Sequence, residues 1–413
     1  MLELLKDKTY IRYWLAVVVS FVGDAMTRVT LIYVAADLTH NPGVIALVAL
    51  AQLLPSGLLG AFVGPLADRI APRGLLVGSD LFRSVIVLAM IPFLDSIAML
   101  VVLILLQGVG KAVFETARIS SVPKIVGRPD RIPKAIALFQ STNWSVNLIG
   151  PAVGGVLIGF GDLSAVLVID AVTYVLSALL LASMVVLREV PIAAGREPYW
   201  QSLRTGVRGV LAVPSLRLLL AITVPVTVVF GLFTTNFNAQ LLTVFELSGF
   251  EFGLASALLA GGSIVGALVG PALIKRYGSG SSLLLVTVGL FGLGLVALAP
   301  TQWLWAQLGL GIVCVWCVLT GVTSGLFQVP IANTLLSDLP EEFRGRGVGL
   351  LNTISINFTV LGIAIGGLIA TAFGVASSII VSGVLLIIFA AVCLVPALRA
   401  APPRDVAERA DVS

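Results

Sequence analysis

The chain has 413 residues, of which 58% are hydrophobic and 11% are charged, and its formal net charge is +4 at pH 7. A mean hydropathy of +1.08 excludes a water-soluble globular protein, because such a protein needs a solvated polar surface. We therefore expect an all-α polytopic membrane protein. Its basic residues are expected to set the orientation of the spans and to meet lipid headgroups rather than nucleic acid.

About a dozen apolar stretches follow one another along the chain, separated by short polar breaks. A helix needs about 20 residues to cross a bilayer, and most of the stretches reach that length. The first six expected spans lie at residues 11–36, 44–67, 74–94, 97–121, 133–160 and 164–187. The next six lie at residues 216–244, 251–275, 281–299, 302–336, 343–372 and 375–398. Twelve transmembrane helices therefore fit the pattern best.

The longest polar stretch separates the two sets of spans, and its prolines and arginines are typical of a linker. We predict an N-terminal six-helix half at 1–189, a cytoplasmic linker at 190–214, a C-terminal six-helix half at 215–400 and a cytoplasmic tail at 401–413. The halves resemble each other, because Gly64-Pro-Leu-Ala ends span two and Gly270-Pro-Ala-Leu ends span eight. Two pseudo-symmetric halves are typical of a transporter that rocks about a central site.

Lys and Arg occur only in alternate breaks between the spans. The basic breaks contain Lys6 and Lys8, Arg69 and Arg73, Lys124 to Lys134, Arg188 to Arg217, Lys275 and Arg276, Arg344 and Arg346, and Arg399 to Arg409. The intervening breaks contain acids such as Asp37 and Asp95, or no charge. Because Lys and Arg near span ends are retained in the cytoplasm, we expect both termini there and an even number of spans.

Residue types that carry enzyme chemistry are scarce in the sequence. The only histidine is His40, and the cysteines Cys314, Cys317 and Cys393 lie inside apolar runs. The sequence shows no metal-ligand cluster, nucleophile and base pair, or phosphate-binding loop. We therefore expect no enzymatic activity, no metal and no cofactor, and ATP is excluded as the direct energy source.

Ionisable residues inside the spans are functional candidates, because burying them costs several kcal/mol unless they are paired or hydrated. Span one contains Asp24 and Arg28, and span four contains Lys111 and Glu115. Each pair is four residues apart, so its members share a helix face and can form an ion pair. We expect Asp24 or Glu115 to exchange a proton under the influence of its cationic neighbour. The alternative is a permanent structural ion pair. Asp170 in span six is expected to bond locally.

Amide side chains also occur within the spans of both halves. In a bilayer such groups are either ties between helices or contacts to a ligand, and both interpretations stay open. Together with Arg28 and Lys111, we assign to a substrate cavity Asn143, Asn147, Asn236, Asn238, Gln328 and Asn352. Aromatic residues such as Phe21 and Trp144 are near in sequence, so the cavity would suit a bulky, partly apolar cargo.

The loop after span two contains Gly64, Asp68, Arg69 and Arg73. This pattern resembles the loop signature of the major facilitator superfamily, and the resemblance extends over essentially the whole chain. It implies a gating cluster that also includes Asp80 and Arg83 of span three and that latches the two halves at the cytoplasmic side. Ala71 and Pro72 depart from the signature, so the turn is expected to differ in shape. The alternative is that these charges only set the topology.

Span five contains Gly150, Pro151, Gly154 and Gly155, which resembles the antiporter motif of exporters in this superfamily. Small residues at this spacing let two helix backbones approach closely, and the proline allows a bend. Stretches such as Phe21-Val-Gly-Asp24 and Asp170-Ala-Val-Thr-Tyr174 resemble the drug and siderophore exporter branch, which includes macrolide-efflux and enterobactin-export proteins. In one respect the chain departs from many drug antiporters, because Ile104 stands where they carry an arginine.

The resemblance implies a monomeric secondary transporter of the bacterial cytoplasmic membrane, with the major facilitator fold and with protons and membrane lipids as its further partners. The expected function is export of an amphipathic, drug-like or siderophore-like small molecule by proton antiport. A flippase or facilitator for lysophospholipids or other lipid-like substrates is the alternative. A receptor that transports nothing is a further alternative.

Overall fold

The computed structural model describes residues 4–67, 70–127, 131–159, 162–188, 214–277, 281–338 and 341–400, and these ranges contain helices and no strand. The helices of the first half are α1 (Lys8–Thr39), α2 (Pro42–Ala67), α3 (Pro72–Met90), α4 (Ile97–Val126), α5 (Ile132–Gly159) and α6 (Leu163–Ala182). Short 3₁₀ turns lie at Leu4–Lys6, Ile91–Phe93 and Val185–Arg188.

The second half contains α8 (Pro214–Ala239), α9 (Gly249–Tyr277), α10 (Ser281–Val296), α11 (Leu298–Leu308), α12 (Leu310–Asp338), α13 (Glu341–Phe373) and α14 (Val375–Ala400). A π-helical turn, Gln240–Val244, continues α8. Within the described ranges, eleven segments are helical, long and apolar enough to cross a membrane, and α10 and α11 together form one of them. α5 is a further helix of 28 residues. The prediction of an all-α polytopic fold with twelve spans is confirmed.

Local sequence signals explain several helix ends. Asp7 precedes α1, and its side chain accepts hydrogen bonds from the backbone N–H groups of Thr9 and Tyr10. Asp162 caps α6 in the same way by accepting from the N–H of Ala165. Such caps satisfy backbone donors that have no partner inside the helix. α4 ends at Gly127, which has a φ of +66° and therefore suits glycine.

The predicted boundary between spans nine and ten is wrong. The apolar pattern predicts a break near Pro300, whereas the helical path runs on through α11 to Leu308 and turns at Gly309. Pro300 lies in the first turn of α11, where its missing N–H would have no helical partner in any case. Gly309 has a φ of +52°, a conformation that glycine adopts readily.

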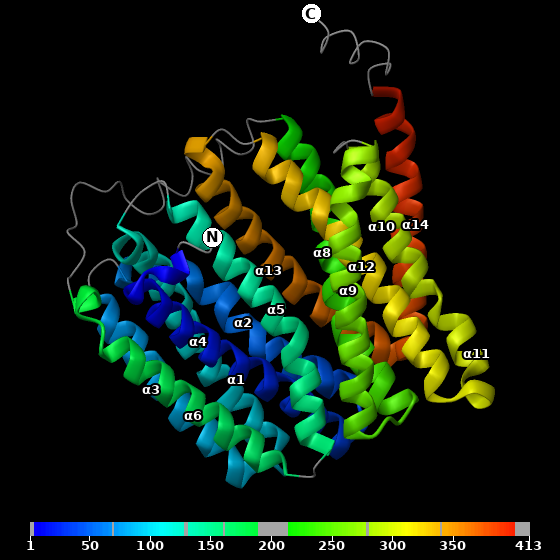
Figure 1. Ribbon diagram of the computed structural model, residues 1–413. Coiled ribbons are helices and arrows are strands. Elements are labelled where there is room, and N and C mark those ends of the chain that lie inside the picture. The colour runs from blue at the N-terminus through cyan, green and yellow to red at the C-terminus, as the bar shows by residue number, and fades with distance from the viewer. Residues whose placement is uncertain are drawn as a thin grey trace, which may run out of the picture.

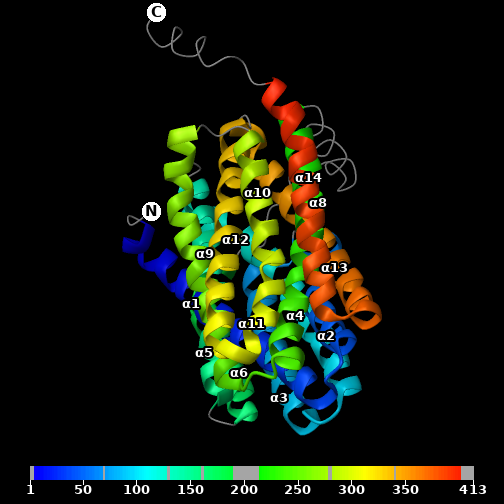
Figure 2. The ribbon, with the colours of Figure 1, turned by 90° about the vertical axis from the view of Figure 1, so that its right-hand side faces the viewer.

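The two halves lie side by side (Figures 1 and 2). Within the first half, α1 and α3 pack on α6, and α2 packs on α4. Within the second, α9 packs on α12, α10 on α14, and α8 on α13. Between the halves, the main contacts join α5 to α9 and α2 to α13. Each interface between the halves therefore pairs one helix from each six-helix set.

We call the helix ends that the charge pattern places outside the cytoplasm the outer ends, and close packing between the halves occurs there. A Cβ added at Gly155 of α5 would lie 2.2 Å from the Cα of Gly253 of α9. Near the outer ends of α2 and α13, a Cβ at Gly367 would lie 2.4 Å from the Cβ of Ala46. Both contacts require glycine, because a side chain at either position would push the halves apart.

Candidate functional site

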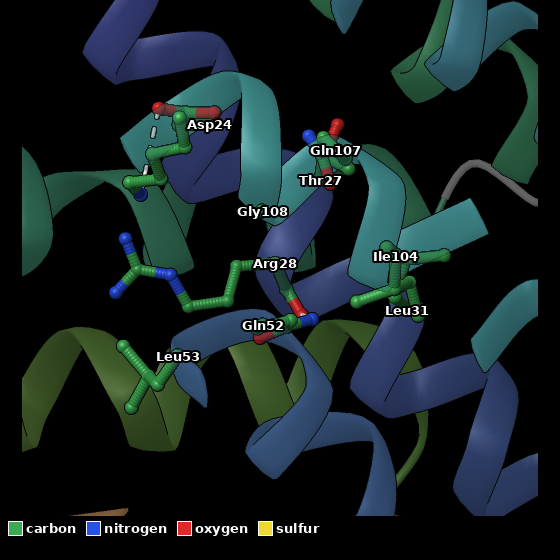
Figure 3. Close-up of a pocket in the computed structure, with 10 residues that line it drawn as sticks. Asp24, Thr27, Arg28, Leu31, Gln52, Leu53, Ile104, Gln107 and Gly108 are labelled. Atoms are coloured by element: carbon green, nitrogen blue, oxygen red, sulfur yellow. Dashed lines mark hydrogen bonds and ion pairs between the residues drawn. The ribbon is translucent and has the colours of Figure 1, made fainter. Parts of the chain in front are cut away.

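A cavity opens between α1, α2 and α4 of the first half (Figure 3). Two amides fix its walls. Gln52 Nε2 donates to the carbonyl oxygen of Arg28 at 3.2 Å, and Gln107 Nε2 donates to Tyr174 Oη at 3.1 Å. The lining residues are Asp24, Thr27, Arg28, Leu31, Gln52, Leu53, Ile104, Gln107, Gly108 and Lys111. Charged and amide groups therefore share this wall with aliphatic side chains.

Asp24 lies at the centre of the site and contacts three other helices. Its Oδ2 is 3.2 Å from Arg83 Nη1 of α3 and 3.5 Å from Lys111 Nζ of α4. Its Oδ1 accepts a hydrogen bond from Tyr174 Oη of α6. The Asp24 side chain is only 6% exposed. Two cations and a hydroxyl together replace the water that an ionised carboxylate would otherwise need.

Arg83 is the fully buried cation that joins these helices. Its Nη2 donates to Ser20 Oγ of α1 at 3.2 Å and forms an ion pair with Asp80. Its guanidinium carbon lies 4.6 Å from the ring centre of Phe114 and 4.3 Å from that of Tyr174. An arginine stacked on aromatic rings while bound to carboxylates is held in one orientation.

Gly110 of α4 makes room for Arg83. A Cβ at this position would lie 2.8 Å from Arg83 Cγ, and the next nearest atom belongs to Phe82. The space that a side chain at Gly110 would take is thus occupied by Arg83 of α3. The arginine that many drug antiporters carry on span four is absent at Ile104, and an arginine from the neighbouring helix reaches the core of the same half instead.

The predicted ion pairs within α1 and within α4 are replaced by other pairings. The ion pairs described for Asp24 join it to Arg83 and Lys111 rather than to Arg28. Arg28 lines the cavity. Glu115 forms its ion pair with Arg118, with Arg118 Nη2 2.6 Å from Glu115 Oε2. Lys111 is thereby drawn across to α1, because packing of α4 against α1 brings a buried carboxylate closer than the one on its own helix.

The predicted gating cluster is only partly visible. Asp68 and Arg69 lie outside the described residues, as do the surroundings of Gly64, and Arg73 is half-buried in the first turn of α3. Asp80 and Arg83 are both fully buried. At 1.5 Å per residue they lie about 12 Å and 16 Å from the start of α3. Their described contacts therefore place them in the core beside Asp24, not at a latch at the helix end.

The glycines of the predicted antiporter motif lie where α5 meets its neighbours. A Cβ at Gly150 would be 2.2 Å from Ala25 Cβ, and one at Gly154 would be 3.2 Å from the carbonyl oxygen of Met26. Gly155 faces α9 of the second half. The side chain of Pro151 lies outside the described residues. The motif thus packs α5 against α1, directly behind Asp24, and against the other half.

The amides predicted to line the cavity do not share one environment. Asn236 is fully buried, and its Nδ2 donates to Ser378 Oγ of α14 at 2.9 Å, so it ties helices together and does not face the cavity. Asn238 is half-buried and donates to the carbonyl oxygen of Thr234 on its own helix. Asn143 is half-buried. The side chains of three further predicted residues lie outside the described part, namely Asn147, Gln328 and Asn352.

Sequence reasoning did not assign Tyr174 to the site, and it placed Arg83 at the gate. The sequence does hold a signal for Tyr174, because the stretches Phe21-Val-Gly-Asp24 and Asp170-Ala-Val-Thr-Tyr174 both resemble the exporter branch. In the structure a Cβ at Gly23 would lie 2.2 Å from Asp170 Oδ1. The two stretches therefore form one contact between α1 and α6.

Comparisons with known proteins agree on one family. The family model described as Major Facilitator Superfamily matches residues 13–356. Macrolide efflux protein A from Streptococcus pyogenes is 24% identical over 397 residues, which cover 92% of this chain and 94% of that protein. Enterobactin exporter EntS from Shigella boydii serotype 18 (strain CDC 3083-94 / BS512) is 29% identical over 287 residues, which cover 66% of this chain and 64% of that protein.

Solved structures share the fold at low sequence identity. The bacterial homologue of the iron transporter ferroportin, solved in an inward-facing state, matches with a TM-score of 0.70 and 15% identity, covering 93% of this chain and 98% of that one. The nucleoside transporter NupG matches with a TM-score of 0.68 and 14% identity, covering 94% of this chain and 100% of that one. At such identities the likeness concerns the fold alone.

Proposed function

The chain belongs to the Major Facilitator Superfamily, and we propose that it exports an amphipathic small molecule, drug-like or siderophore-like, in exchange for protons. The observation that carries the proposal is Asp24, a buried carboxylate at the middle of α1 whose partners come from α3, α4 and α6. A change in the packing of these helices alters the charges around Asp24. Alternating access of the family's fold supplies such a change.

The direction of coupling follows from electrostatics. In the present form, with the halves packed together at their outer ends, Arg83 and Lys111 favour the ionised form of Asp24. A proton on Asp24 would therefore be released on the cytoplasmic side. When the outer ends separate and Lys111 moves away from α1, burial favours the neutral carboxylic acid, and Asp24 takes up a proton from outside. One inward proton would accompany each outward step.

Asp24 is a better candidate for the exchanged proton than Glu115, the other acid predicted for this role. Glu115 is bound to Arg118, which lies three residues further along the same helix. Relative movement of helices leaves such a pair intact, so its protonation is poorly linked to alternating access. The partners of Asp24 lie on other helices, and its environment therefore changes with their movement.

The cargo class is proposed from the lining and from the relatives. The cavity combines cations and amides with Leu31, Leu53 and Ile104, a mixture that suits a partly apolar molecule with polar groups. The printed names of two relatives are those of a macrolide efflux protein and an enterobactin exporter. We further propose that the chain acts as a monomer in the bacterial cytoplasmic membrane, with both termini in the cytoplasm.

The test measures accumulation of dyes, macrolides and siderophores in bacteria that lack their own pumps. Cells express the wild-type chain, Asp24→Asn, or Asp37→Asn as the matched control, because Asp37 is an exposed acid near the outer end of the same helix. We expect the wild type and Asp37→Asn to lower accumulation of at least one compound. Asp24→Asn and a protonophore should each abolish that effect.

Two results would overturn the proposal. Export that persists in Asp24→Asn would remove the carboxylate from the coupling mechanism. Export of no compound, although each variant reaches the membrane, would remove the drug-like and siderophore-like cargo class. Transport of fluorescent lysophospholipids would then be measured in reconstituted vesicles. Movement of these lipids without any pH change inside the vesicle would establish the facilitator alternative instead.

A further inference from the structure

Asp170 of α6 is a buried acid for which the coupling scheme above has no use. It is fully buried, and its Oδ2 has no hydrogen-bond partner among the described residues. Its Oδ1 accepts from Thr173 Oγ1 at 3.3 Å, a hydroxyl that also donates to the Asp170 carbonyl oxygen at 2.7 Å. The local bonding expected for Asp170 is thus present but leaves one carboxyl oxygen without a partner.

Asp170 and Asp24 belong to one site. The backbone of α1 presses directly on the Asp170 carboxyl, because a Cβ at Gly23 would lie 2.2 Å from both Asp170 Oδ1 and Thr173 Oγ1. Asp24 is the next residue along α1. Tyr174, one turn along α6 from Asp170, donates to Asp24 Oδ1. The contact at Gly23 leaves no space for water between the two helices at this point.

The contacting charges near Asp170 already balance without it. On α1 and α3, Asp24 and Asp80 are the acids, and Arg83 and Lys111 are the cations that contact them. The terminal nitrogens of Arg83 are directed to Asp24, Asp80 and Ser20. An ionised Asp170 would add a negative charge beside Asp24 that none of the described ion pairs compensates.

The remaining cation of the site lies on the Asp24 side. Arg28 is one turn along α1 from Asp24 and lines the same cavity, so its charge further favours the ionised form of Asp24, and the only ionisable residue in the sequence of α5 is Lys134, at its start. Ionising two neighbouring acids in a buried site costs free energy through their mutual repulsion, so one of the two acids keeps its proton. Asp24 has the cations, so Asp170 is the acid that remains neutral.

We propose that Asp170 is a second proton-binding group of the coupling site, which in this structure holds its proton as a neutral carboxylic acid beside the ionised Asp24. The inference rests on the proposed coupling at Asp24 for its role in transport. Separation of α1 from α6 at Gly23 would admit water to Asp170, and its proton would then leave to that water. The site would hold two exchangeable protons rather than one.

Infrared spectroscopy of the purified chain in lipid tests the protonation directly, because the carbonyl stretch of a protonated carboxyl group differs from that of a carboxylate. At neutral pH we expect a protonated-carboxyl band that disappears in Asp170→Asn. The band should remain in Asp95→Asn, whose exposed acid lies in the outer loop between α3 and α4. It should weaken in Asp24→Asn, because that variant removes the neighbouring negative charge and frees Arg83 and Lys111 from Asp24. Asp170→Glu, which keeps a carboxyl group, should shift the band and serves if Asp170→Asn does not fold.

An unchanged band in Asp170→Asn would overturn the inference. Where Asp170→Asn does not fold, a band that Asp170→Glu leaves unshifted would overturn it. This readout needs no cargo, so a failure of the exporter proposal would leave it intact. The role in transport is then measured as protons moved per cargo molecule in vesicles. We expect the ratio to fall by one in Asp170→Asn, and an unchanged ratio would confine Asp170 to a structural role.

Discussion

The two halves share one six-helix plan but have different interiors. Ionisable residues lie within the spans of the first half, namely Asp24, Arg28, Asp80, Arg83, Lys111, Glu115, Arg118 and Asp170. In the second half, Asp, Glu, Lys and Arg occur only near span ends, as Glu246, Glu251, Lys275 and Arg276 illustrate. One half therefore holds a charge network at mid-membrane depth, and the other holds none.

The second half packs its interior with aromatic rings and glycines instead. The ring centres of Phe237 and Trp316 are 5.6 Å apart, and those of Phe291 and Phe327 are 5.1 Å apart. Trp316 Nε1 donates to the carbonyl oxygen of Gly294 at 3.0 Å. Such packing stabilises helices by dispersion and needs no charged side chain.

Pseudo-symmetry of the fold therefore does not require the two halves to carry the same kinds of residue in their interiors. Charges confined to one half can change their partners when that half rearranges, while a neutral half can move as a packed unit. We therefore expect variants in the first half to affect proton exchange and stability together. Variants in the second half should affect stability alone, and four experiments test this contrast in order of decreasing effect.

Arg83→Gln should be the most damaging substitution, because it leaves Asp24 and Asp80 buried with one cation fewer. Removing one partner of a buried ion pair costs about 3–5 kcal/mol. Thermal unfolding of the purified protein should show the largest fall in midpoint among the variants. The double variant Arg83→Gln with Asp80→Asn should recover part of this loss. An unaltered midpoint in Arg83→Gln would contradict the role of the network.

Gly155→Ala tests the contact between the halves. The new methyl group would overlap Gly253 of α9, and overpacking costs about 1–3 kcal/mol, which shifts an equilibrium by about tenfold or more. We expect the form that is open at the outer ends to gain population. Labelling of Ile158→Cys, a buried position beside Gly249, measures this once the native cysteines have been replaced.

The matched control for this experiment is Gly261→Ala on α9, because a Cβ at Gly261 meets no atom within 4 Å. Labelling of Ile158→Cys should be faster in the Gly155→Ala background and unaltered in the Gly261→Ala background. Equal labelling in both backgrounds would show that the close approach of α5 and α9 does not hold the outer ends together.

Lys111→Gln and Glu115→Gln compare two charges of the same helix. Lys111 contacts Asp24 and is 27% exposed, so its loss should leave the protein folded. A hydrogen bond to a charged group contributes about 1.5–3 kcal/mol, and we expect proton-coupled export to fall by about tenfold or more. Glu115→Gln should lower export far less. A larger effect in Glu115→Gln, measured as proton flux in vesicles, would transfer the exchange role from Asp24 to Glu115.

Asn236→Ala and Asn238→Ala should have the smallest effects. Asn236 ties α8 to α14 through Ser378, and such bonds in membrane proteins contribute about 1 kcal/mol. The hydrogen bond described for Asn238 lies within its own helix, so the loss of this side chain should barely alter the unfolding midpoint. Both variants should keep the wild-type ratio of protons to cargo. A changed ratio in Asn236→Ala would mean that the second half takes part in coupling.

Much of the fold could be predicted from the sequence because its signals are local. Apolar runs of sufficient length give the helices, as the described segments confirm. The exception is the turn at Gly309. The apolar pattern predicts the break at Pro300 instead, although a proline is tolerated in the first turn of a helix. The position of such a turn depends on backbone geometry, and the sequence allows it at Pro300 as well as at Gly309-Leu310-Gly311.

The sequence predicts most charged residues of the candidate site, but it does not predict which of them form ion pairs. The sequence identifies Asp24, Lys111 and Arg83 as candidates, but helical spacing pairs Asp24 with Arg28 and Lys111 with Glu115, each four residues apart on one helix. The structure joins Asp24 to Arg83, 59 residues away, and to Tyr174, 150 residues away. Asn236 shows the same limit, because its partner Ser378 is 142 residues distant.

The composition alone requires a bundle of membrane-spanning helices, since exposing backbone and polar groups to lipid is costly and leaves few other folds. The order of residues also shows which half carries the buried charges. Which cation each carboxylate meets depends instead on tertiary packing. Helix packing sets those distances, and at Gly23 and Gly110 the absence of a side chain lets Asp170 and Arg83 reach the core of the first half.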